Sequence, residues 1–444
     1  MPMDRAGADG IENTHKPIVS PDEPRVKLRH IARTFLGIGL ASFSLAALGE
    51  AKEWVTTKRK WFTAEEYLQG LGLAQLLPGA PTVNLSSYLG FRLRGLPGAA
   101  VATVCFLTPC FLLMLFLSYL YFQYGEMAVV SGLFRGLGAL VIGLVFNTIL
   151  NLWRSGVRTS FNWLMAICGF AMVFWFKLGI IGILLIAGGA SLAMVLLEFR
   201  FPALARWSGD WNGLKKNSVV PSPSPDYQSR SASDFLSACC RAPLPTGWRS
   251  MTSLLVLLAL MFAADLAIIG LWPEIMRMGS SFLRIGALTF GSGYAMLPFI
   301  QNTVVTQFGW LTNRQFAVAL ALSLITPGPV TIIGVFIGYR VAGIPGAVVG
   351  MVNMYLPAWA MTTVVAAPYA RAGQAVHVKK VISGIVAAFI GTLVVVLIRL
   401  SVNTLVDIPT IAMAAGAFFV QRFSKVDTVW IVLGGALVSL AVFH

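Results

Sequence analysis

The sequence predicts an all-α integral membrane protein made of two homologous halves in inverted topology, with helices that Pro and Gly break into re-entrant or discontinuous segments. Three observations predict it: an apolar composition, an internal repeat, and a Pro-Gly break at the same place in each repeat. Of the 444 residues, 57% are hydrophobic and 11% are charged, whereas an ordinary soluble domain has roughly 25% charged residues. The apolar runs lack a strict apolar-polar alternation, so helices are favoured over an outer-membrane barrel.

Apolar runs close to the length that crosses a bilayer, about 20 residues, recur along the chain. We expect spans at 97–122, 128–151, 160–176 and 178–197 in the first half, and at 345–370, 381–400, 404–421 and 427–443 in the second. A further span at 250–272 has no counterpart, and inversion requires an odd crossing of this kind. Segments 33–50 and 282–298 are shorter, and whether they cross or re-enter stays open.

The chain divides into a tail, two repeats and a linker. Residues 1–33 are polar and contain no apolar leader segment, so we expect a cytoplasmic tail. Pro, Ser and basic residues characterise 199–249, which predicts a flexible cytoplasmic linker. The first repeat then covers 34–198 and the second covers 250–444.

The two repeats share motifs in the same order. The segment "TFLGIGLASF" (34–43) corresponds to "SFLRIGALTF" (281–290), and "LGFRLRGLPGA" (89–99) corresponds to "IGYRVAGIPGA" (337–347). Between these motifs, "PGAP" (78–81) corresponds to "PGP" (327–329). Duplication explains this order and near-constant spacing far better than chance.

Charges in equivalent loops predict that the repeats face opposite ways. The loop 51–60 is basic and its equivalent 301–310 has no charge, whereas 123–130 lacks Lys and Arg and 371–380 is basic. Because short cytoplasmic loops carry an excess of Lys and Arg, equivalent loops lie on opposite sides of the membrane. This is an inverted-topology repeat, the architecture of many secondary transporters.

The basic balance and the scarce reactive residues exclude several classes of function. The net charge of +15 comes from short loops, which indicates membrane orientation rather than nucleic-acid binding. The five Cys have no paired metal spacing, Cys239 and Cys240 fall in the basic linker, and the four His lie in tails, loops or the terminus. With no Walker A sequence either, we expect no metal, no cofactor and no enzyme activity.

The matching breaks, "LLPGAPTVN" (76–84) and "ITPGPVT" (325–331), predict an interior site. Pro removes a backbone donor, and freed backbone groups are tolerated at depth only where they face protein or a water-filled cavity. We expect half-helices at 66–77 and 314–325 before the breaks, and at 82–93 and 330–341 after them. The later half-helices begin at the break, where free N–H groups and the positive end of the helix dipole favour anions. A kink that serves only packing is the alternative, but two breaks in register favour a site.

The candidate site combines these breaks with nearby polar and Gly residues. Arg92 and Arg340 are either counter-charges for an anion or interfacial residues that fix topology. Asp265 is either a proton-coupling residue or a partner in an interhelical hydrogen bond. The candidate substrate-binding residues are Pro78, Gly79, Pro81, Thr82, Asn84 and Arg92 in the first repeat, and Gly291, Ser292, Tyr294, Thr326, Pro327, Gly328, Pro329, Thr331 and Arg340 in the second.

The ordered motifs resemble those of the chromate ion transporter family, in its two-domain, long-chain form. They are "FGSGYAMLP", "GWLT", "ALALSLITPGPVTI", "IGYRVAGIPGA" and "YLP" in the second half, and "QLLPGAP", "YLGFRLRGLPGA" and "TPCF" in the first. The resemblance implies a carrier that exports chromate, driven by the proton-motive force, with sulfate as the natural competitor. The chain departs from the family pattern at "FSLAALGE" (43–50) and "PGAPTVN" (78–84), where Ser42, Ser44 and Asn84 mark a variant anion pocket.

We therefore expect a secondary oxyanion transporter of the inner membrane, with protons as the coupling ion, that confers chromate resistance. A sulfate-type carrier without chromate export is the alternative within the same class. A passive anion channel and a membrane enzyme acting on a phosphate-bearing lipid are alternatives from other classes, although the scarcity of buried carboxylates and His disfavours the enzyme. The oligomeric state stays open, with a homodimer as one option.

Overall fold

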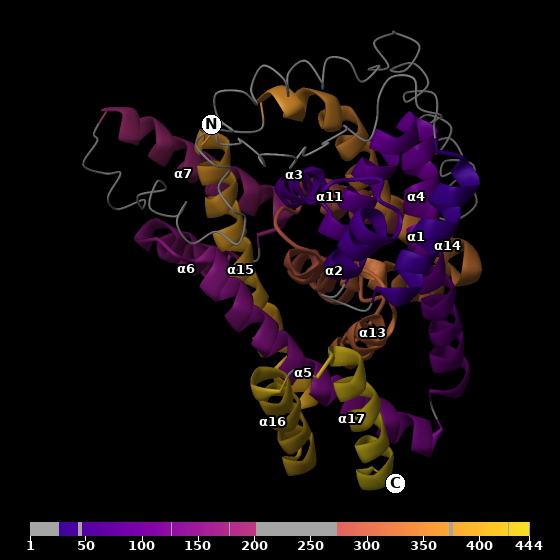
Figure 1. Cartoon of the computed structure of the whole chain (residues 1–444). Helices are drawn as coiled ribbons and strands as arrows, with labels where there is room; N and C mark the ends of the chain where they lie inside the picture. Colours follow the sequence, from indigo (N-terminus) through magenta and orange to yellow (C-terminus); the bar gives the residue numbers. More distant parts are fainter. Residues whose placement is uncertain are drawn as a thin grey trace, which may run out of the picture.

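The computed structural model describes residues 26–42, 47–125, 127–176, 178–200, 273–372, 376–424 and 426–443. All predicted spans within these ranges are helical, and the described residues contain no strand (Figure 1). The predicted span 250–272, its Asp265, Ser44 and all of the linker beyond residue 200 lie outside the described residues. The two domain boundaries near 33 and 249 stay predictions, and α1 already begins at Leu28.

The helices follow one another in the same order in both halves. Those of the first half are α1 (Leu28–Ala41), α2 (Ala47–Lys52), η2 (Glu53–Lys58), α3 (Ala64–Leu76), α4 (Pro81–Tyr124), α5 (Ala128–Gly156), α6 (Ser160–Phe174) and α7 (Ile180–Arg200). Those of the second half are α11 (Pro273–Leu288), η5 (Gly293–Met296), α12 (Leu297–Gln301), η6 (Asn302–Gln307), α13 (Asn313–Ile325), η7 (Val330–Ile332), α14 (Ile333–Ala372), α15 (Val376–Thr404), α16 (Ile408–Phe423) and α17 (Thr428–Val442).

Each broken segment forms a re-entrant hairpin rather than a helix that crosses in two pieces. In the first half, α3 and residues 81–93 of α4 run antiparallel, because residues progressively earlier in α3 contact residues progressively later in α4. We call this pair the first hairpin and its turn, residues 77–80, the first tip. The contacts are Asn84 with Ala74, Gly70 with Tyr88, and Glu66 with Arg92.

A capping box starts α3, and a Gly ends the second helix of the hairpin. Thr63 Oγ1 accepts from the Glu66 N–H, and the Glu66 carboxylate accepts from the Thr63 N–H at 2.9 Å. At Arg94 and Gly95 the α4 backbone leaves helical geometry, with φ +64° at Gly95, a conformation that suits Gly. The rest of α4 then folds back antiparallel, so that Gly98 lies against Gly90 without a side chain between the two backbones.

The second half repeats these details. Thr312 and Gln315 make the same capping box at the start of α13, and α14 breaks at Ala342 and Gly343 with nearly the same backbone angles as its counterpart. We call α13 and residues 330–341 the second hairpin, and residues 326–329 the second tip. The α13 helix contacts both η7 and α14, as the fold of the first half requires.

Equivalent helices of the two halves cross antiparallel, which is what inverted topology demands. Near one end of α5, a Cβ at Gly138 would lie 3.2 Å from Thr404 Cγ2, which belongs to the last residue of α15. At the other end, a Cβ at Gly156 would lie 2.7 Å from Ile390 Cδ1, earlier in α15. The contacts therefore run in opposite directions along the two helices: the middle of α5 meets the end of α15, and the end of α5 meets the middle of α15.

The last three helices of each half exchange partners. Helix α5 packs on α16 and α17 of the other half, where Gly143 meets the Ala414 carbonyl, and α15 packs on α6 and α7, where Gly391 meets the Ala166 carbonyl. We call these two groups the arms, and both are visible in Figure 1. The exchange places extensive apolar contacts between the halves, so the linker is not what joins them.

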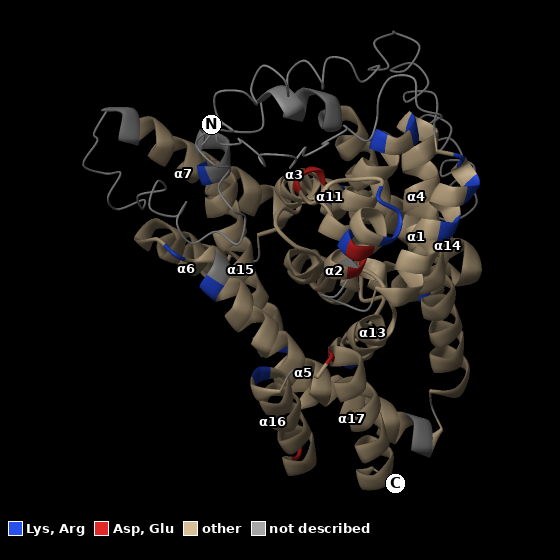
Figure 2. Ribbon diagram, in the orientation of Figure 1, with Lys and Arg blue, Asp and Glu red and all other residues tan. Residues whose placement is uncertain are grey.

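The remaining helices carry the hairpins. Both α1 and α11 bury one apolar face, and Gly39 of α1 and Gly286 of α11 approach the carbonyls of Phe106 and Met354. Five described helices are long and apolar enough to cross a membrane, by length and composition. Figure 2 shows the long arm helices mostly free of charge, with charged residues gathered around α1 to α4.

Candidate functional site

The first tip presses against the second half of the protein. The Gly79 N–H donates to the carbonyl of Thr289, at the end of α11, at 2.9 Å. Gly79 has φ +102°, and a Cβ there would lie 2.6 Å from Cβ of Ala358 in α14. Only Gly fits both the backbone conformation and this close approach.

The second tip makes the matching contact with the first half. Gly328 has φ +132°, and a Cβ there would lie 2.9 Å from Cys110 Sγ in α4. Cys110 and Ala358 occupy equivalent positions, each one residue after a Pro, Pro109 or Pro357. The two tips are therefore related by the internal symmetry, and each contacts a long helix of the other half.

Hairpins of this length that begin at the membrane faces would end inside the bilayer. The 13 residues of α3 and the 13 of α13 each extend about 20 Å, and the hydrocarbon core is about 30 Å thick. Because the halves are inverted, the two hairpins enter from opposite faces. The tips therefore reach the interior from both sides, which is the arrangement that the matching breaks predict.

Asn84 holds the first tip in shape. Its side chain is fully buried, and Nδ2 donates to the carbonyls of Ala74 and Pro78, both at 3.1 Å. Its Oδ1 accepts from Thr362 of α14 at 3.3 Å. The amide thus satisfies carbonyls that the helix break leaves without partners and positions the tip. Its role in substrate binding stays a prediction.

Thr331 pairs with a tyrosine beside the second tip. Its hydroxyl lies 3.0 Å from the hydroxyl of Tyr355 in α14, and both side chains are buried. The sequence analysis missed Tyr355 as a site residue. A phenol two residues before the Pro of "YLP", in an otherwise apolar span, is the signal that would have found it.

The Gly-rich loop before α12 lies against the same tip. A Cβ at Gly293 would lie 3.6 Å from Thr331 Cγ2, and the Ser292 hydroxyl accepts from the Tyr294 N–H at 3.1 Å. Gly291, with φ +101°, approaches Val386 of α15. The structure therefore brings Gly291, Ser292 and Tyr294 together with Thr331, as the sequence analysis grouped them.

The other predicted tip residues serve the local turns. Pro81 begins α4, and the Thr82 carbonyl accepts from Ser86 Oγ at 2.8 Å. At the second tip, Thr326 Oγ1 donates to the Ser323 carbonyl at 2.9 Å, and Pro327 and Pro329 flank Gly328. The tips contain no charged side chain, so any attraction for an anion there comes from neutral donors and helix ends.

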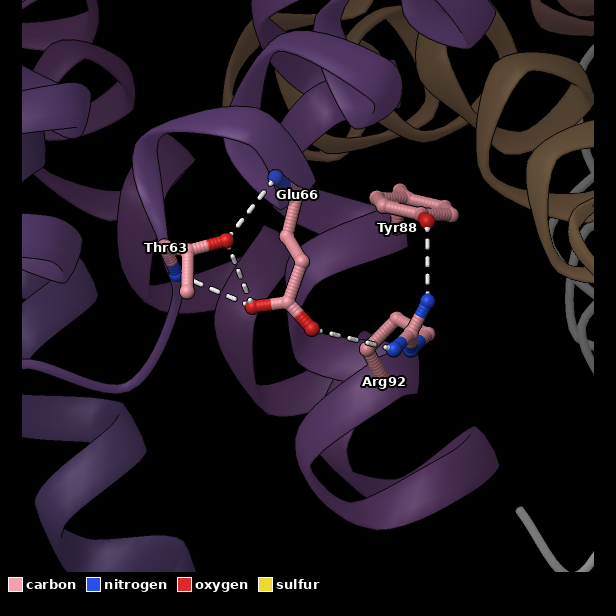
Figure 3. A network of polar contacts seen from close by, with 4 residues as sticks. All are labelled: Thr63, Glu66, Tyr88 and Arg92. Atoms are coloured by element: carbon pink, nitrogen blue, oxygen red, sulfur yellow. Dashed lines mark hydrogen bonds and ion pairs between the residues drawn. The ribbon is translucent and has the colours of Figure 1, made fainter. Parts of the chain in front are cut away.

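Arg92 and Arg340 lie at the bases of the hairpins rather than beside the tips. Arg92 donates to the Tyr88 hydroxyl at 3.2 Å and pairs with Glu66 at 3.7 Å (Figure 3). It follows Pro81 by eleven residues, about 16 Å along a helix. Arg340 stacks over the Phe122 ring at 5.8 Å. This placement agrees with the interfacial alternative for both arginines.

Two further polar groups are a buried hydroxyl at the end of α1 and a charge inside a span. Ser42, at the end of α1, is fully buried and its hydroxyl has no hydrogen-bond partner. Arg399 lies within the apolar helix α15 and bonds to Gln301. The sequence analysis overlooked Arg399, although an ionisable residue in the run "FIGTLVVVLIRLSV" is itself a signal. No group of His, Cys, Asp or Glu in the described ranges is arranged to hold a metal ion.

These features define a class: a multi-pass membrane protein with inverted repeats, in which the tip of each re-entrant hairpin contacts a long helix of the other half, as in secondary transporters. The family model described as "Chromate transporter" matches residues 29–194 and 276–440, one match in each repeat. The chain belongs to this family of membrane transporters, so it is a transporter and not an enzyme.

Characterised and inferred relatives resemble the chain over nearly its whole length. A chromate transport protein of Cupriavidus metallidurans is 30% identical over 95% of this chain and 94% of its own. A probable chromate transport protein of Synechococcus elongatus is 30% identical over 87% and 88%, and a chromate transport protein of Pseudomonas aeruginosa is 27% identical over 95% and 94%. No solved structure matches the chain significantly.

Proposed function

We propose that this protein is a secondary transporter that exports chromate across the inner membrane, driven by the proton-motive force, and so confers chromate resistance. The carrying observation is the pair of symmetry-related tips, Gly79 against Ala358 and Gly328 against Cys110. Membership of the chromate transporter family and relatives named as chromate transport proteins support the choice of substrate.

The chemistry of the tips suits a tetrahedral oxyanion. The second helix of each hairpin begins at its tip, so backbone N–H groups and the positive helix end lie at the tip. The hydroxyls of Thr331 and Tyr355 add neutral donors beside the second tip. Neutral donors can replace the hydration of a divalent anion and release it again, because no fixed charge holds it permanently.

Transport by this arrangement requires alternating access. One half would rock against the other around the tips, so that the anion meets first one membrane face and then the other. The proton would need a titratable group along the path. Asp265 remains our candidate for that role from the sequence, and it lies outside the described residues.

The direct test measures labelled chromate in everted membrane vesicles, where export from the cell becomes uptake into the vesicle. We expect saturable uptake that needs an imposed proton gradient and that a protonophore stops. Excess sulfate should compete weakly. Uptake that ignores both the gradient and the protonophore, and that does not saturate, would replace the carrier with a passive anion channel.

The sulfate alternative makes a different prediction in the same vesicles. A sulfate-type carrier without chromate export would take up labelled sulfate and would show no uptake of labelled chromate. Cells that express it would then be no more resistant to chromate than cells with an empty vector. Vesicles that carry Gly328→Leu serve as the transport-negative control for both substrates.

A further inference from the structure

Arg399 is a charge inside a membrane-spanning helix that the tips do not explain. It lies five residues before the end of α15, within the apolar stretch Lys380–Thr404, and its side chain is half-buried. A charged side chain in a membrane-spanning helix is costly. Such residues usually face a polar interior and have a function there.

The described partners of Arg399 are neutral. Its Nη1 donates to Gln301 Oε1 at 3.4 Å, and Gln301 Nε2 donates to Asn313 Oδ1 at 2.8 Å. Gln301 is only 1% exposed, so its hydrogen bond to Arg399 lies inside the protein and orients the guanidinium. No carboxylate lies within ion-pair distance of Arg399 among the residues that the structure describes.

The internal repeat provides a control for the structural role of this arginine. Asn151 occupies the equivalent position in α5, because Gly143 and Gly391 are equivalent and each lies eight residues earlier. Helix α5 carries no charged side chain of its own there, although Arg422 of α16 donates to the Asn151 side chain at 3.4 Å. An arginine is therefore not a requirement of the helix, and its presence in one half only points to a role on one side of the membrane.

Two further arginines lie on the elements beyond Asn313. Asn313 begins α13, and the next residue, Arg314, donates to Ser131 Oγ of α5 at 3.4 Å. One turn further along α5, Arg135 pairs with Asp407 at the start of α16. Arg135 therefore already neutralises Asp407, so this carboxylate is not left for Arg399.

We propose that Arg399, held by Gln301 and Asn313, binds the oxyanion at a second position, on the membrane face opposite the base of the first hairpin. This inference rests on the proposed function. A planar guanidinium can bind two oxygens of a tetrahedral oxyanion at once and is charged. The neutral donors at the tips do not provide such a charged, two-oxygen contact. The position lies where α15 meets α12 and α13, between an arm and the second hairpin. An anion passing between the second tip and that face would meet it.

The test compares Arg399→Gln and Arg399→Lys with the wild-type protein in reconstituted vesicles, with labelled chromate supplied from each face in turn. We expect Arg399→Gln to raise the half-saturating chromate concentration about tenfold from the Arg399 face, the loss of one charge-assisted interaction. Chromate supplied from the other face should show a much smaller change. The lysine variant should recover part of the affinity because it keeps the charge and loses the planar fork.

Arg422→Gln is the matched control, since Arg422 is another arm arginine that bonds to a neutral amide, Asn151, at 3.4 Å. It should leave the half-saturating concentration unchanged from both faces. Equal affinity in wild type and Arg399→Gln, or a loss of maximal rate alone in both Arg399 variants, would overturn the second position. The proposed function would survive that result, and it would fail only if wild-type vesicles carried no chromate at all.

Discussion

The two hairpins share one backbone and differ in their surroundings. Helix α13 is buried along most of its length and contacts α5, α15 and α17, whereas α3 packs chiefly on α4 and exposes Gln69 and Gln75. Yet the capping boxes, the positive-φ Gly residues at the tips and the breaks at Gly95 and Gly343 agree closely. The same local geometry therefore occurs in unequal packing: in this structure the second hairpin is docked against the arms and the first is not.

The difference extends to side chains at equivalent positions. Glu66 at the base of the first hairpin corresponds to Gln315 in the second, and Asn84 near the first tip corresponds to Ile332. The second hairpin, which is docked against the arms, is thus the more apolar of the two, and this suits its burial there. The undocked hairpin carries its own polar network to hold its shape without them (Figure 3).

The strongest way to break this comparison is to lock one hairpin. A Cβ at Gly138 would lie 3.7 Å from Cβ of Ala317 in α13, within the range that a disulfide needs. We expect Gly138→Cys with Ala317→Cys, in a chain without its native cysteines, to cross-link and to stop chromate transport until a reductant is added. Transport at the wild-type rate in the cross-linked protein would show that the second hairpin does not leave the arms.

The symmetric pair sharpens the same test. Leu68 and Val386 are the equivalents of Ala317 and Gly138. If the hairpins exchange places, Leu68→Cys with Val386→Cys should cross-link more in the presence of chromate and a proton gradient than without them. If the cross-linking yield does not respond to chromate and the proton gradient, the second hairpin alone docks against the arms.

The next effect in size comes from the tips. Gly328→Leu forces a side chain against Cys110 and a strained backbone, which together cost at least about 1–3 kcal/mol. We expect labelled-chromate uptake to fall at least about tenfold, with protein abundance in the membrane largely kept. Gly416→Leu is the matched control, because Gly416 in α16 has nothing within 4 Å of an added Cβ. Similar losses in both variants would point to general misfolding.

Asn84→Ala should produce a moderate loss of stability. It leaves the carbonyls of Ala74 and Pro78 without their partner, and we expect the protein in detergent to lose about 2 kcal/mol of stability. Thermal unfolding monitored by tryptophan fluorescence measures this change. Asn403→Ala removes an exposed amide with one bond, to the Arg399 carbonyl, and should cost much less. Equal shifts would remove Asn84 from its positioning role.

Glu66→Gln gives the smallest effect and makes the first hairpin resemble the second. Glu66 and Arg92 are each about one-third exposed, and ion pairs of this kind contribute about 0.5 kcal/mol or less. The glutamine can keep the capping box, as Gln315 does at the equivalent position. We expect nearly unchanged thermal stability and transport. A large loss of transport with normal stability would instead assign Glu66 a role in coupling.

Much of the site was predictable in outline and little of it in detail. The breaks at Gly79 and Gly328 are visible because Pro and Gly act on the backbone within a few residues. The role of Asn84 was not visible in the sequence, because its hydrogen bonds depend on how the two helices of the hairpin pack together. The positions of Arg92 and Arg340 were not predictable either, since the point at which a helix turns back decides whether an arginine lies at the tip or at the base of a hairpin.

The sequence by itself determined the helical membrane class, the duplication and the opposite orientation of the halves, whereas the predicted spans 160–176, 404–421 and 427–443 form helices of only 15 or 16 residues. These depend on hydropathy, repetition and loop charge, which each segment carries on its own. Only the tertiary structure decided that the broken segments return as hairpins, that α5 and α15 exchange partners, and that one hairpin is docked. Such features depend on contacts between residues far apart in the chain, such as Gly143 with Ala414, and each half offers equivalent surfaces for either choice.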